Sequence, residues 1–285
     1  MANKKITELQ LRDNVTADLN IPGDDGIQTY RVTAQQIKDY ILANDAIATA
    51  MIQALSVTNA KIANSTIASA KTNFTAPTVQ VFKSGSGTYT LPSGVKRIIV
   101  SMVGGGGSGS AGATTGASAN GNDGTTSTFG SSLLIAGNGR GGAYASIAGS
   151  VANTINSPAI EIINVLGGNG QTGGRDTQYV MAGMGGSSYF GGAGGAVLAG
   201  AGGNAIANTG GGGAGGAGSA GTTLSTVSGS GGSAGSFLKA LINSPSSSYS
   251  YSVGSGGASK TGEGATGQNS GAGGSGIIIV EEFYE

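Results

Sequence analysis

Apolar and polar residues alternate in short runs through the C-terminal part of the chain, with Gly, Ser and Asn between the runs. Such alternation is typical of half-buried β-strands, and Gly-rich breaks are typical of turns. The last run, 277–284, is so apolar that we expect it to be buried on both faces. The predicted strands are 79–82, 88–91, 97–103, 131–136, 159–166, 237–242, 249–253 and 277–284.

The N-terminal region, 1–43, shows one alternating run followed by a helical one. A Gly-Asp-Asp-Gly turn signal at 23–26 precedes the alternating run 27–32. Thr33 and Gln36 match a capping box, and apolar residues follow at helical spacing. The pattern predicts a small α+β module over 1–43. It is too small to bury a core of its own, so we expect it to attach to a partner.

Residues 44–77 are Ala-rich and have an apolar seam at spacings of four, four, three and four. This seam is typical of a helix with coiled-coil-like a and d positions. One interpretation is an amphipathic helix packed on its own domain. The other, which we favour because the segment separates two unlike modules and has few charges, is a helical trimerisation neck. The seam residues are Ile47, Met51, Leu55, Thr58 and Ile62.

The third region, 78–285, contains most of the glycine. Of the 57 Gly in the chain, all but five (57 − 5 = 52) fall from Gly104 to Gly276. The region lacks the Gly-X-Y register of collagen. Apolar residues recur throughout it, whereas a disordered linker would contain few of them. Segments with three residues per turn and no side chains at their contacts can form hydrogen bonds with one another through their backbone N–H and C=O groups. We therefore predict a mainly β domain with an irregular, polyglycine-II-like part.

Composition excludes several kinds of chemistry. The formal net charge is zero, and the chain contains no Cys, His or Trp. These values argue against nucleic-acid binding, a Ser-His-Asp triad and a structural zinc site. We expect no enzyme activity, no cofactor and no membrane insertion. The N-terminus has no apolar signal region, so we expect synthesis in a cytoplasm without secretion.

One nucleotide-binding pattern is formally present. Gly104–Gly109 matches G-x-G-x-x-G after an apolar run, and Asp123 follows at a suitable distance. A dinucleotide site also needs a helix that starts at the loop, and the residues that follow are poor helix formers. In a region so rich in glycine the match is expected by chance.

Polar and aromatic residues that interrupt the glycine runs are the candidates for recognition. Exposed Arg and aromatic side chains are common anchors of binding surfaces. The alternative for each is a packing role, which we favour for Phe129 and Phe190. The receptor-binding candidates are Arg140, Tyr144, Arg175, Asp176, Tyr179 and Tyr189.

Several segments resemble those of bacteriophage fibre proteins. Residues 6–9 and 30–37 resemble a virion attachment module, 59–71 a trimeric neck, and 89–107 and 271–284 the two ends of a Gly-rich distal domain. The resemblance implies a homotrimer on the virion surface that docks on a phage structural protein through its N-terminus. It also implies polyglycine-II helices whose connecting loops bind a bacterial surface receptor.

Three other functions remain open. The chain could be a structural head fibre or a capsid or tail decoration protein with no dedicated receptor. A Gly-rich surface-adsorbing protein would need flat faces of small residues, which the insert at 175–179 interrupts. A capsule depolymerase would need a pair of facing carboxylates.

Overall fold

The computed structural model describes residues 75–114, 119–144, 146–174, 181–218 and 227–284, which belong to one compact unit, Asn73–Glu285. Within these ranges the protein is all-β and contains no helix. The mainly β prediction is therefore confirmed for this part of the chain. The predicted attachment module, 1–43, and the part of the predicted neck up to residue 74 lie outside the described residues. The last three residues of the predicted neck, 75–77, are described and are not helical.

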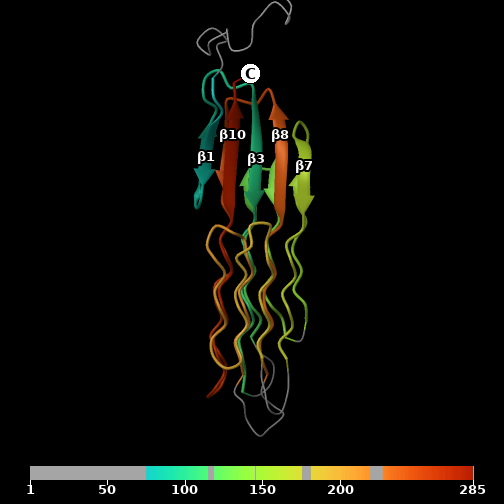
Figure 1. Ribbon diagram of the computed structural model, residues 1–285, viewed down its shortest axis with the longest axis vertical. Coiled ribbons are helices and arrows are strands. Elements are labelled where there is room, and N and C mark those ends of the chain that lie inside the picture. The colour runs from blue at the N-terminus through green and yellow to red at the C-terminus, as the bar shows by residue number, and fades with distance from the viewer. Residues whose placement is uncertain (1–74, 115–118, 145, 175–180, 219–226, 285) are drawn as a thin grey trace, which may run out of the picture. The chain divides into compact units, whose positions relative to one another are not determined.

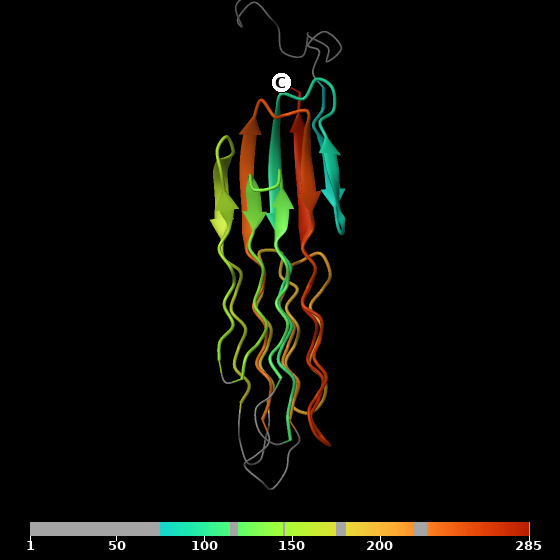
Figure 2. The same cartoon turned by 180° about the vertical axis from the view of Figure 1, so that it is seen from behind.

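The described residues form two five-stranded antiparallel sheets (Figure 1). The first has the order β1-β10-β3-β8-β7, and the second, which lies nearer the viewer in Figure 2, has the order β2-β9-β4-β5-β6. The strands are β1 (Thr78–Phe82), β2 (Ser86–Thr90), β3 (Arg97–Val103), β4 (Ser127–Phe129), β5 (Leu134–Ala136), β6 (Thr154–Ile155), β7 (Ile160–Val165), β8 (Phe237–Asn243), β9 (Ser248–Ser252) and β10 (Ile277–Phe283).

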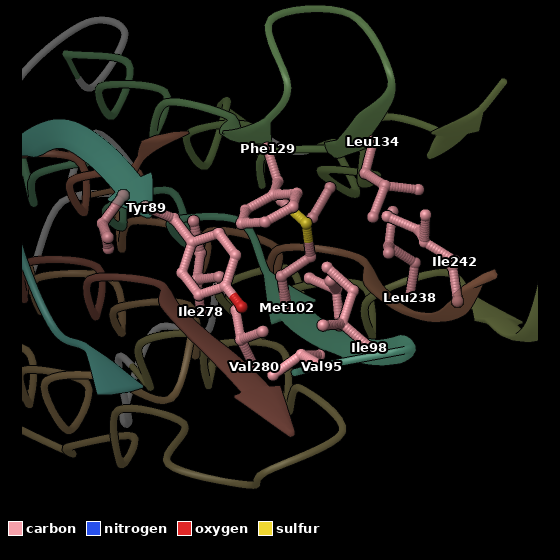
Figure 3. Packing of buried hydrophobic residues seen from close by; sticks show 14 residues of the cluster. Tyr89, Val95, Ile98, Met102, Phe129, Leu134, Leu238, Ile242, Ile278 and Val280 are labelled. Carbon is pink, nitrogen blue, oxygen red and sulfur yellow. The ribbon is translucent and has the colours of Figure 1, made fainter. Parts of the chain in front are cut away.

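The hydrophobic core lies between the two sheets (Figure 3). Alternate residues of β3, β8 and β10 point inward and meet Tyr89 and Phe129 from the second sheet. Because successive side chains of a strand point to opposite faces, only one face of each strand enters this core. The prediction that the last strand is buried on both faces is wrong. Ile278 and Val280 are buried, whereas Ile277 and Ile279 on the other face are partly exposed.

The predicted strand positions agree with most of the observed ones. The run 131–136 is an exception, because a turn occupies its first half and β5 begins only at Leu134. Gly130 and Ser131 take positive φ values of 68° and 55° in this turn, which is incompatible with an extended strand. The short strands β4 and β6 were not predicted, since they contain three and two residues and show no clear alternation.

Below the sheets the chain continues as long Gly-rich segments that run back and forth along the same direction (Figure 1). We call this part the glycine-rich bundle. It lies beyond one end of both sheets, and several of its segments extend directly from the ends of strands. The described segments are 104–114, 119–126, 137–144, 146–153, 166–174, 181–188, 193–199, 201–206, 211–218, 227–236, 253–262 and 267–276.

The central segment, 104–114, bonds to its neighbours with a period of three residues. The N–H groups of Gly104, Gly107, Ser110 and Ala113 donate to carbonyls of 227–236. Those of Gly105, Ser108 and Ala111 donate to 119–125, and those of Gly106, Gly109 and Gly112 donate to 268–274. Three successive N–H groups thus point to three different neighbouring segments.

The carbonyl groups of the same segment accept bonds from other neighbours. Gly105 and Ser108 accept from 139–142, Gly107 and Ser110 accept from 213–216, and Gly106 accepts from Gly257. The central segment is therefore surrounded by six others that satisfy its backbone in both directions. This arrangement meets the requirement that buried N–H and C=O groups be paired.

Close contact between backbones explains why glycine is needed here. A Cβ atom built on Gly109 would lie 2.0 Å from the carbonyl oxygen of Ala214, and one on Gly106 would lie 2.0 Å from that of Gly211. Neither neighbour is a flexible side chain, so the backbones would have to separate to admit a methyl group. Where side chains do occur inside the bundle, they are small.

Buried serines complete the backbone hydrogen bonding of the bundle. The N–H of Asn122 donates to Ser108 Oγ at 2.8 Å, and that of Ser230 donates to Ser110 Oγ at 2.7 Å. The N–H of Arg140 likewise donates to Ser233 Oγ at 2.8 Å. A serine hydroxyl can accept one bond and donate another, so it stands in for a carbonyl that the neighbouring segment does not supply.

Candidate functional site

The glycine-rich bundle has two ends with different surroundings. Its sheet end includes the turns 188–192 and 206–210, where Gly210 lies against Val103 of β3 and the N–H of Gly210 donates to Ser275, just before β10. Its far end includes residues 112–114 and the turn 263–266, where the N–H of Thr114 donates to the carbonyl of Glu263. The candidate residues divide between these two ends.

Tyr189 lies at the sheet end, not at the far end. Its ring stacks on Phe237, the first residue of β8, with centroids 4.0 Å apart and an interplanar angle of 7°. Phe190 meets the same ring edge-on at 5.4 Å. One face of Tyr189 is therefore used in packing, and the expected packing role of Phe190 is borne out only in part, since its ring remains 39% exposed.

Tyr144 lies near the far end, at the end of segment 137–144, and is 40% exposed. Its backbone N–H donates to Asn120 Oδ1 at 3.3 Å, which links it to the start of the neighbouring segment 119–126. The backbone position of Tyr144 is thus fixed while its ring faces solvent. This combination suits a recognition residue.

Arg140 lies one turn before Tyr144 in the same segment, and its side chain is exposed. Its backbone is held on both sides, because its N–H donates to Ser233 Oγ and its carbonyl accepts from the N–H of Ser233. The N–H of Gly141 donates to Asp123 Oδ1 at 2.7 Å. The aligned amide at Gly141 therefore holds the Asp123 carboxylate beside this segment.

Arg175, Asp176 and Tyr179 lie outside the described residues. The residues that flank them are described, and the N–H of Gly174 donates to the carbonyl of Met181 at 2.7 Å. The two ends of this insert are therefore side by side at the far end of the bundle.

Three further exposed residues at the far end escaped prediction. Ile147 and Leu198 are 62% and 63% exposed, and Met181 is also largely exposed. With Tyr144 they place four apolar side chains on four different segments, and we call these four residues the far-end group. In the sequence these are apolar residues within the glycine-rich region, which suggests core packing. The glycine content could have indicated their exposure, because an interior built from closely packed backbone has no room for such side chains.

Three of the described carboxylates have partners within the sheets. Glu281 forms an ion pair with Lys239 at 3.3 Å, and Glu161 accepts a bond from Asn164. Glu282 is buried between the sheets, where Tyr89 donates to it at 2.9 Å and Gln80 at 2.7 Å. Burial, followed by the hydrogen bond and the charge of Glu282, raises the pKa of Tyr89 far above its usual range.

Among the described residues, no three Asp or Glu side chains come close enough to hold a metal ion. The same residues include no helix long and apolar enough to cross a bilayer. No known family model matches the chain, and a search of curated proteins finds no relative.

Proposed function

We propose that this chain is a homotrimeric phage virion fibre whose glycine-rich end adheres to a bacterial surface. In this proposal residues 1–43 dock on a phage structural protein and 44–77 form the trimeric neck. The proposed role is binding and not catalysis. The observation that supports adhesion is the far-end group, which exposes apolar side chains on a backbone held by hydrogen bonds.

We further propose that the segments of the bundle are polyglycine-II helices. Such helices have three residues per turn and no internal hydrogen bonds, so their N–H groups point outward in three directions. The three-residue period of the bonds made by 104–114 supports this assignment, as does its ring of six neighbours. The repeated close approach of glycine to neighbouring carbonyl oxygens supports it as well.

A bundle of this kind suits adhesion because it separates the scaffold from the contact surface. The backbone bonds fix the segments, while the residues at their ends are free to vary in sequence. Single exposed apolar side chains give weak contacts. Three copies on one fibre would strengthen them through avidity.

The proposal is tested by the binding of fluorescently labelled full-length protein to a panel of bacterial strains. We expect saturable binding to susceptible cells that competes with phage adsorption. Leu198→Asp should reduce binding about tenfold or more, because loss of an apolar anchor from an interface typically has an effect of this size. Ile206→Asp is the matched control, since Ile206 is 64% exposed but lies at the sheet end.

Two results would contradict adhesion through the far end. If both variants bind as the unchanged protein does, another surface makes the contact. If a folded trimer binds no strain and does not compete with phage, the structural head fibre or decoration protein is the better description. Deletion of 44–77 tests the trimer separately, since it should leave a monomer in light-scattering measurements.

A further inference from the structure

The outer face of the first sheet is unusually apolar for a surface. This face is formed by the residues of β1, β10, β3, β8 and β7 that point away from the core, and it is turned toward the viewer in Figure 1. At its two edges Val79 is 57% exposed and Ile160 is 50% exposed. We call it the outer face.

Strand register places these residues in rows across the sheet. Val79 lies opposite Glu281, Glu281 opposite Ile99, Ile99 opposite Leu241, and Leu241 opposite Ile160. The next row begins with Val81, which lies opposite Ile279. Residues directly opposite each other on antiparallel strands have neighbouring side chains. The first row is aliphatic apart from Glu281, whereas the second continues from Ile279 to Ser101 and Lys239. The outer face therefore carries more aliphatic side chains than the polar outer face expected of a solvated sheet.

Two opposite charges on the outer face neutralise each other. Lys239 pairs with Glu281 near the middle of the sheet, and both side chains are about one third exposed. Arg97 lies over the ring of Phe283 at 5.2 Å. A face with little net charge does not select a strongly charged partner. It is compatible with an identical face, which would not repel it.

The described part of the chain covers only one end of the outer face. Tyr189 and Phe190 pack on Phe237, and the turn at Gly210 packs on Val103. Phe237 and Val103 are consequently buried, while the valines and isoleucines farther along the strands stay exposed. Exposed apolar patches of this kind are typical of surfaces that bind another protein.

We propose that the outer face packs against the same face of neighbouring copies of this chain, around an axis parallel to the strands. The proposal rests on the proposed trimer and identifies where the distal domains meet. The chain enters the sheet at β1, directly after the predicted neck, and β1 is an edge strand of this face. A parallel neck would hold the three β1 strands at the same level and bring their outer faces together.

Single cysteines test this packing in the full-length chain, which has no Cys of its own. The variants are Val81→Cys and Ile160→Cys on the outer face, with Thr88→Cys as control. Thr88 is exposed on β2 of the other sheet. In the intact protein we expect maleimide to modify both outer-face variants about tenfold or more slowly than the control, because they react only after local opening. In the combined variant Val81→Cys/Ile160→Cys, a short bismaleimide should link different chains.

The outcomes separate this inference from the proposed function. A trimer by light scattering, with fast modification at both sites and no link between chains, would overturn the inference and leave the trimer standing. Slow modification without links would also overturn it, since the chain's own residues 1–74 would then be the cover. A monomer would overturn the proposed trimer itself. Urea-unfolded samples should react equally at all three sites, which checks the reagent.

Discussion

The sheets and the glycine-rich bundle both have a buried interior, but side chains fill the interior between the sheets and backbone fills that of the bundle. Between the sheets, large side chains such as Phe129 and Met102 fill the interior, and backbone groups pair along strands. Within the bundle, backbones contact one another directly, and carbonyl oxygens occupy the places where side chains would otherwise lie. Burial in the first region removes apolar surface from water, whereas burial in the second mainly exchanges hydrogen bonds with water for bonds between segments.

The two regions should therefore respond to mutation in opposite ways. The sheets should tolerate changes that preserve volume and suffer from loss of volume. The bundle should suffer from any gain of volume at its contacts. Its high glycine content also raises the entropy lost on folding, so the many hydrogen bonds between its segments are needed to offset that loss.

Loss of volume between the sheets should have the largest effect. Phe129 is fully buried and stacks near Tyr89 and Tyr249. Phe129→Ala should lower the free energy of unfolding by about 3–5 kcal/mol, measured by urea titration followed with tyrosine fluorescence. Phe190→Ala is the control, because Phe190 is 39% exposed and should lose much less. Equal losses at both sites would show that the space between the sheets is not the main core.

A gain of volume inside the bundle should have the next largest effect. Gly109→Ala places a methyl group 2.0 Å from the carbonyl oxygen of Ala214. We expect destabilisation of about 3 kcal/mol, near the upper end for overpacking, since no side chain can move aside. Thermal unfolding monitored by circular dichroism measures this change.

Gly195→Ala is the matched control for the bundle. A Cβ at Gly195 would meet nothing within 4 Å, and the residue has no positive φ. This change should be neutral or stabilise by about 0.5 kcal/mol, because alanine restricts the unfolded chain. If both substitutions destabilise equally, loss of chain freedom and not backbone contact accounts for the glycine.

How far the sequence predicts the structure differs between the same two regions. Alternation located the strands of the sheets well, because each strand has one buried face whose side chains repeat every second residue. It failed for β10, whose isoleucines fill both faces although only one enters the core. The order of strands in each sheet could not be predicted, since β3 pairs with β8 and β10, which both lie far along the chain.

In the bundle the composition indicated backbone packing, but it did not predict where the candidate recognition side chains lie. Tyr189 and Tyr144 look alike in the sequence, since each is an aromatic residue beside a glycine pair. The structure separates them, because Tyr189 stacks on β8 and Tyr144 lies near the far end. The end of the bundle at which a side chain lies depends on the direction in which each segment runs. Glycine runs contain no sequence pattern from which that direction can be predicted.

The junction of the two regions should show an effect of intermediate size. Ser127 is fully buried there, donates to the carbonyl of Val103 at 2.7 Å and accepts from the N–H of Gly254 at 2.9 Å. Ser127→Ala leaves both backbone groups without this partner and should destabilise by about 1–3 kcal/mol in urea titration. Ser255→Ala, at an exposed hydroxyl, should change stability by less than about 0.5 kcal/mol. A neutral Ser127→Ala would mean that water can replace the hydroxyl.

High pH should weaken the sheets more than the bundle, and Tyr89 provides the test. Its phenol is buried beside Glu282, so its pKa in the folded protein lies far above the ordinary value of 10.0. Below pH 10 the phenol is neutral in both states and no stability is lost. Above pH 10 it ionises in the unfolded chain first, so stability should fall by about 1.4 kcal/mol per pH unit from this group. Unfolding titrations between pH 9 and 11 should show this slope reduced in Tyr89→Phe and retained in Tyr144→Phe. An unchanged slope in Tyr89→Phe would place the alkaline sensitivity outside the core between the sheets.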